Sequence, residues 1–189
     1  IMQLTRQQKR AFRELGYTVL RGVIPQVMID DALRAINHSL GYEGMAKDDL
    51  PRLRAQSYCN EVQKTPPITD LMNRSPVFPL VESMLGEGNL QEVVTGQIAL
   101  RFPIEPSNDP SPPHGHLDGL GSGLNGSAKG SYNRGFTALA VILLSGLRDD
   151  FAGNFTVWPR SHAFFESYFK EHGHEVLEQG MPRVALPEG

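Results

Sequence analysis

The sequence predicts a mainly β fold with helices at its N-terminus. Glycine (19 residues) and proline (14 residues) are both frequent, which favours a loop-rich β architecture over a helical bundle. Most of the sequence signals for helices lie in residues 1–89. Apolar runs typical of strands follow at 90–102, at 136–144 and between Gly153 and His162.

Length and composition predict one domain. A chain of 189 residues that is 40% hydrophobic and 21% charged has the size of a single globular unit. We expect one domain over 1–189, with a helical layer and lead-in over 1–89 and a core over 90–189.

Charge and cysteine content limit the partners and the compartment. The net charge of −3 argues against nucleic acid or an anionic membrane as a partner. Cys59 is the single cysteine, so no internal disulfide can form, which agrees with a reducing compartment. Because no apolar run is long enough to cross a bilayer and the first residues lack an apolar signal core, we expect a cytoplasmic location.

Two helices are predicted near the N-terminus. Thr5 begins a capping box for a helix that should end at Gly16. A short strand over 17–23 follows. Pro25 opens a second helix with one apolar stripe, and Gly41 should end it.

Residues 42–74 have no clear period and predict irregular structure with one short helix or strand. Ser75 is an N-cap candidate for a third helix, which Gly86 should close. Ser161 is the N-cap candidate for a last helix with an aromatic face.

Two of the predicted strands have distinct roles. In the strand over 90–102, Gln97 and Arg101 are four residues apart and share a face. Arg101 suits a carboxylate ligand, because a guanidinium forms paired hydrogen bonds with it. An arginine at a strand end that faces water is the alternative. The segment 136–144 is the most apolar of the chain, and we expect it to be a core strand buried on both faces.

The candidate metal ligands are His114, His116 and Asp118, which alternate along the chain and would project from one face of a strand. Three successive alternate residues on one ion would strain the backbone, so we expect a pair from here and a third ligand from elsewhere. We favour His116 and Asp118, since an imidazole and a carboxylate with open positions suit Fe(II).

Other interpretations of this segment stay open. A His-x-Asp pair also occurs by chance in surface loops. The pattern also matches the His-x-His-x-Asp-His zinc signature of metallo-β-lactamase-type hydrolases, except that Gly119 replaces the last histidine. The glycine-rich stretch from Gly119 to Gly130 is either a lid or a solvated insertion.

Three further histidines are poor ligand candidates. His162 lies just inside the start of the last predicted helix, where a histidine usually makes a hydrogen bond that supports the fold. His172 and His174 are typical of a solvated helix end.

Together these residues resemble the phytanoyl-CoA dioxygenase family of Fe(II)- and 2-oxoglutarate-dependent oxygenases. Four stretches recur in the family's order: Leu4 to Val23, Leu100 to Pro103, His116-x-Asp118, and Gly153 to His162. Within the last, Arg160 stands where the family usually has glycine.

The resemblance implies a double-stranded β-helix, a cupin-like jelly roll, behind the N-terminal helices. It makes His116 and Asp118 the first two iron ligands, and His162 a residue that does not bind iron. The third ligand histidine, and the arginine that binds the distal carboxylate of 2-oxoglutarate, are expected beyond Gly189. Since such a core needs about eight strands, we expect the C-terminal strands to be missing from this chain and the chain to be inactive alone.

The implied protein is an oxidoreductase, a cytoplasmic dioxygenase that binds iron and uses 2-oxoglutarate as its cosubstrate. Its other partners are O2 and a small organic substrate whose unactivated C–H bond is hydroxylated. Related halogenases lack the carboxylate, so Asp118 favours hydroxylation. Gln97 and Arg101 are the candidates for contacts to 2-oxoglutarate or substrate. A metallo-β-lactamase-like zinc hydrolase and a non-catalytic jelly-roll binding module are the alternatives.

Overall fold

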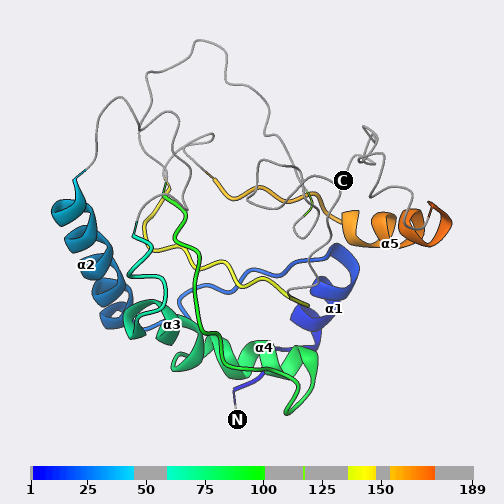
Figure 1. Ribbon diagram of the computed structural model, residues 1–189. Helices are drawn as coiled ribbons and strands as arrows, with labels where there is room; N and C mark the ends of the chain where they lie inside the picture. Colours follow the sequence, from blue (N-terminus) through cyan, green and yellow to red (C-terminus); the bar gives the residue numbers. More distant parts are fainter. Residues whose placement is uncertain (1, 45–58, 101–116, 118–135, 148–153, 173–189) are drawn as a thin grey trace. The chain divides into compact units, whose positions relative to one another are not determined.

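The structure, a computed structural model, describes residues 2–44, 59–100, 117, 136–147 and 154–172. The described elements are five helices, drawn as coils in Figure 1: α1 (Arg6–Leu15), α2 (Gln26–Glu43), α3 (Pro66–Asn73), α4 (Val77–Leu85) and α5 (Ser161–His172). The chain divides into two compact units. Described residues 2–5, 19–44, 59–100, 140–147 and 154 belong to the first unit, and 6–18, 117, 136–139 and 155–172 to the second.

The predicted helix boundaries agree well with the structure. α1 follows Thr5 directly and ends before Gly16, whose φ of +86° and N–H bond to the carbonyl of Phe12 (2.8 Å) close the helix. α2 follows Pro25 but continues through Gly41 to Glu43, because the helical hydrogen bonds extend to Gly44.

Ser75 joins α3 to α4. Its buried hydroxyl donates to the carbonyl of Leu71 (2.6 Å) and accepts the N–H of Val77 (3.1 Å), so one side chain satisfies backbone groups at the end of one helix and the start of the next. Gly86 follows α4 with a φ of +101°, as expected for the residue after a helix. α3 itself lies in the region where the sequence predicts only one short element.

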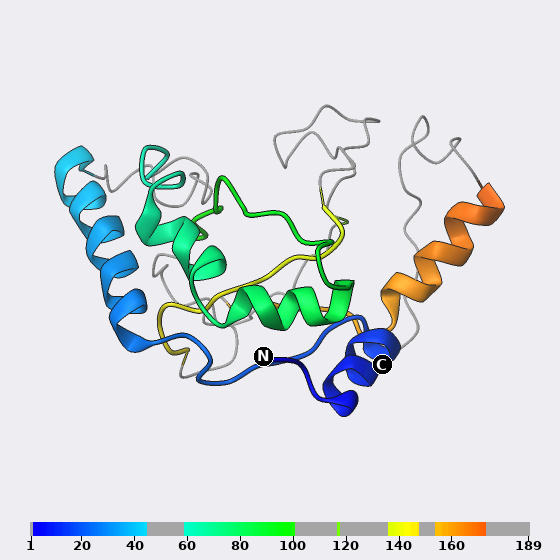
Figure 2. The ribbon, with the colours of Figure 1, turned by 90° about the horizontal axis from the view of Figure 1, so that it is seen from below.

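The core of the first unit forms where α3 packs against α2 and α4 (Figure 2). Its buried members come from α2, α3, the segment before α3 and the extended segment 90–100: Ala32, Ile36, Cys59, Val62, Ile68, Leu71 and Ile98. Cys59 is a free, buried thiol whose S–H points to the carbonyl of Ile36 (3.9 Å), so it acts as a small core residue. Ile142 and Leu144 pack against this cluster from the outside.

The prediction of a mainly β fold is wrong for the part of the chain that the structure describes. Residues 17–23, 90–100, 136–147 and 154–158 have no helix, but none of them is a strand, and there is no sheet or jelly roll among the described residues. Apolar runs of this kind favour an extended backbone. A sheet also requires that such segments exchange backbone hydrogen bonds with one another.

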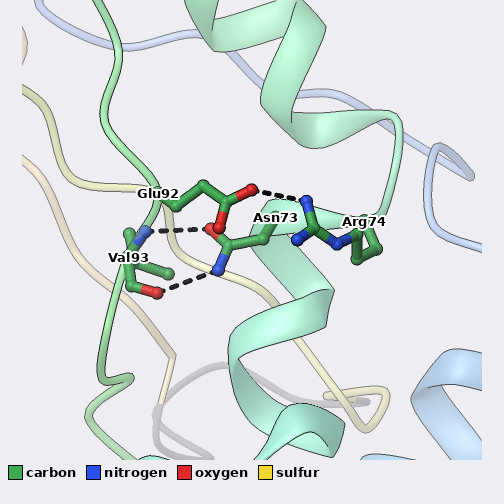
Figure 3. A network of polar contacts seen from close by, with 4 residues as sticks. All are labelled: Asn73, Arg74, Glu92 and Val93. Carbon is green, nitrogen blue, oxygen red and sulfur yellow. Dashed lines mark hydrogen bonds and ion pairs between the residues drawn. The ribbon is translucent and has the colours of Figure 1, made fainter.

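In the segment 90–100 the backbone partners recorded in the structure come from elsewhere. The side-chain amide of Asn73, at the end of α3, donates to the carbonyl of Val93 and accepts its N–H, each at 2.9 Å (Figure 3). Gly96 donates to the carbonyl of Gln63 (2.9 Å). One asparagine therefore occupies both backbone groups that Val93 would use in a β-ladder.

The segment 136–144 is also not the doubly buried core strand that its composition predicts. Ile142 and Leu144 contact the core, whereas Leu139, Val141 and Leu143 are exposed, Leu143 to 63%. The segment is therefore not buried on both faces.

Candidate functional site

The predicted metal pair flanks a residue that the structure describes. Leu117 is half-buried. His116 and Asp118 lie outside the described residues, as do His114, Arg101 and the glycine-rich stretch after Asp118, so the predictions made for them stay predictions.

Gln97 is the one predicted contact residue that the structure describes. Its side chain is exposed, while Ile98 beside it is buried in the core. Gly96 is tightly packed, since a Cβ added there would lie 2.7 Å from Cγ2 of Ile68. Packing of Gly96 and Ile98 against the α3 region therefore fixes the backbone around Gln97 and leaves its amide in solvent.

The best-defined polar arrangement in the second unit joins the end of α1 to the start of α5. Nε2 of His162 donates to the carbonyl oxygen of Arg13 (3.1 Å), and the N–H of Arg160 donates to that of Leu15 (2.8 Å). Both acceptors belong to the last turn of α1, where helix carbonyls lack partners within the helix. His162 thus stabilises a helix end.

Gly16 makes this contact possible. A Cβ at this position would lie 2.5 Å from Nδ1 of His162, so only glycine admits the imidazole. The structure confirms the prediction that His162 is a hydrogen-bonding element of the fold.

Arg160 has a left-handed backbone, with a φ of +65°. This region favours glycine, and an L-residue there is strained. The turn before α5 consequently has the conformation of a glycine turn although an arginine occupies it.

His172 ends α5 in a way that fits the predicted solvated helix end. Its ring stacks on Tyr168 with centroids 4.2 Å apart, and Nδ1 donates to the carbonyl of Tyr168 (3.0 Å). The described histidines, cysteine and carboxylates form no group of three that could hold a metal ion.

One charged surface was missed in the sequence. Arg6, Lys9, Arg10 and Arg13 follow one another along α1 at intervals of three and four residues. Such spacing places them on one face of the helix. The sequence itself shows this spacing, because basic residues can be compared with the helical period in the same way as apolar residues.

No family model matches the chain, and no significant match is found among curated proteins or solved structures. None of the helices that the structure describes is long and apolar enough to cross a membrane.

Proposed function

We propose that the protein is an Fe(II)- and 2-oxoglutarate-dependent dioxygenase that hydroxylates an unactivated C–H bond of a small organic molecule. The observation that carries this proposal is the pair His116 and Asp118, on either side of half-buried Leu117. The proposal does not require the β fold that the described residues lack.

The donor set fits the metal. A neutral imidazole and a carboxylate are the ligand types that non-haem Fe(II) oxygenases combine at sites with open positions. Bound iron together with 2-oxoglutarate and O2 supplies the oxidation itself. In this assignment His116 donates a nitrogen lone pair to the metal, Asp118 binds it and offsets part of its charge, and Arg101 holds a carboxylate through paired hydrogen bonds. The residue that supplies a third protein ligand is not assigned.

Two features of the described residues support the family pattern behind the proposal. Arg160 occupies a position where the family usually has glycine, and its φ of +65° is a glycine-like conformation. His162, which the pattern treats as a residue outside the iron site, uses its ring to bind the Arg13 carbonyl. A cytoplasmic location belongs to the same proposal, supported by the free thiol of Cys59.

The test is 2-oxoglutarate turnover by the intact protein, measured as succinate formed with Fe(II) under air. Asp118→Ala should abolish turnover, and Arg101→Ala should raise the 2-oxoglutarate concentration needed for half-maximal turnover. The matched control is Asp31→Ala, which removes an exposed carboxylate paired with Arg34 on α2 and should change neither quantity.

The rival functions give different results in the same assay. A zinc hydrolase would contain two zinc ions and form no succinate, and a binding module would contain no metal. Either outcome, or full turnover by Asp118→Ala, would overturn the proposal.

A further inference from the structure

A second candidate surface lies on α1, and its residues are basic, unlike the predicted iron ligands. Arg6, Lys9, Arg10 and Arg13 fall within one arc of the helix, which we call the α1 basic face. Arg6, Arg10 and Arg13 are exposed and Lys9 is half-buried. The opposite side of the helix carries Phe12 and Leu15, which are half-buried.

Two cations of the α1 basic face, Arg6 and Lys9, lie in the first turn and oppose the helix dipole, whereas Arg13 in the last turn favours it. The first turn contains no acidic residue. Cations there meet the positive end of the helix dipole and repel one another at three- and four-residue spacing. In the described part of the chain, Glu14 is the one carboxylate recorded in an ion pair with this face, through Nε of Arg10 (2.7 Å). An anionic ligand would relieve this repulsion.

Part of the α1 basic face borders a shallow, open hollow. Lys9, Arg10, Arg13 and Glu14 line this hollow. Glu14 accepts the Nε–H of Arg10, so the two terminal NH2 groups of that exposed guanidinium are not used in this ion pair. The terminal NH2 groups of arginine recognise the oxygens of a phosphate group in pairs.

We propose that the α1 basic face binds a compact ligand that carries two or more adjacent phosphate groups. The four cations are spread over seven residue steps, about 10 Å at 1.5 Å per residue, which matches a short phosphate chain. A nucleic acid duplex or a membrane would need a broader basic surface, whereas this chain has a net charge of −3 and concentrates four of its 18 Lys and Arg residues here.

The experiment is calorimetric titration of the iron-free protein with inorganic tripolyphosphate at constant ionic strength. The test protein carries Arg6→Gln, Lys9→Gln, Arg10→Gln and Arg13→Gln together, because glutamine has a helix propensity close to that of lysine and arginine. The backbone carbonyl of Arg13 that binds His162 is retained. Arg34→Gln and Lys170→Gln, which remove exposed paired cations from α2 and α5, are the controls.

We expect the fourfold variant to bind tripolyphosphate at least about tenfold more weakly, the size of one lost charge-assisted contact or more. Without ligand its midpoint of thermal unfolding should stay close to that of the wild type, because the repulsion that is removed is offset by the loss of the Arg10–Glu14 ion pair and of Arg13 from the last turn. Single Arg10→Gln and Arg13→Gln variants should each weaken binding by a smaller factor, and they test the proposal if the fourfold variant does not fold.

Unchanged affinity in the variants, an equal loss in the controls, or equally strong binding of sulfate would overturn the proposal. So would binding of anionic vesicles or duplex DNA in preference to tripolyphosphate. Because the titration contains no iron, its outcome does not depend on the dioxygenase proposal, and a protein that binds tripolyphosphate but forms no succinate would separate the two.

Discussion

The helices of the first unit and its extended segments both contribute side chains to the core. Helices form where the sequence predicts them, whereas the described extended segments form no strands. α2 and α4 start beside a proline and end close to glycine, and each buries one stripe of residues. The extended residues at 90–100 and 140–147 also place some side chains against the core. Within 90–100, Val93 and Gly96 form hydrogen bonds with the α3 region and the segment before it instead of with a neighbouring strand. A helix satisfies its backbone locally, whereas an extended segment depends on what the rest of the chain offers.

The largest effect should come from the helical core. Ile36 on α2 is 4% exposed, so Ile36→Ala should lower the free energy of unfolding by about 2–5 kcal/mol. Leu143→Ala should change it by less than about 0.5 kcal/mol, because that side chain is exposed. Urea unfolding of both variants measures the difference. Equal losses would mean that the extended segment is a doubly buried core strand after all.

The next prediction compares alanine substitutions at two glycines, to separate the cost of a positive φ from the cost of a lost contact with a distant side chain. Gly16 and Gly22 both have a positive φ, but only at Gly16 would a Cβ meet another side chain, that of His162. Gly22→Ala should cost about 1–2 kcal/mol from the backbone alone. Gly16→Ala should cost about 1–3 kcal/mol more, because the imidazole must move. If thermal or urea unfolding gave equal values for the two, the imidazole would not pack on Gly16.

These two comparisons show why part of the fold was predictable. Thr5, Gly16 and Gly86 mark helix ends by their own chemistry, so the boundaries of α1 and α4 could be read from the sequence. The hydrogen-bond partner of Val93 could not be predicted. The side chain of Asn73 is twenty residues away, and nothing in the sequence of 90–100 identifies it as the partner.

Some features of the candidate site could also be predicted from the sequence, and others could not. The structural role of His162 was predictable from its place at a helix start, and its partner, the Arg13 carbonyl, was not, since it lies 149 residues away. His116 and Asp118 are identified by residue type and spacing alone. The α1 basic face follows a helical period, but its hollow depends on the side-chain conformations of Arg10 and Glu14.

A smaller effect tests the two hydrogen bonds between the Asn73 side chain and the backbone of Val93, which we call the clamp between α3 and the extended segment. Asn73→Ala should lower the free energy of unfolding by about 1–3 kcal/mol, because it leaves the half-buried N–H and carbonyl of Val93 without this partner. Asn73→Asp should also destabilise the protein at neutral pH, since a carboxylate cannot donate to the carbonyl. The neighbouring exposed ion pair between Arg74 and Glu92 serves as the control, and Arg74→Gln should cost only about 0.2–1 kcal/mol. Losses of the same size in both would mean that the clamp adds nothing beyond a surface contact.

The smallest effect concerns acid stability. The hydroxyl of buried Ser39 donates to the Glu61 carboxylate, and this bond lowers the pKa of Glu61 from its usual 4.5. A lowered folded-state pKa stabilises the protein above the unfolded value, and the contribution disappears as the pH falls through the folded value. Ser39→Ala should therefore flatten the decline of unfolding free energy below pH 4.5. In a Glu61→Gln background the same substitution should leave the pH profile unaltered; a continued change would assign the effect to another group.

The most direct test of the dioxygenase assignment is an equilibrium Fe(II) titration of the intact protein without oxygen, compared among wild type, His116→Ala, Asp118→Ala and the control Asp31→Ala. The assignment predicts one iron per chain, a loss of affinity of at least about tenfold in each of the first two variants, and no loss in the control. Wild-type affinity in either His116→Ala or Asp118→Ala would contradict it.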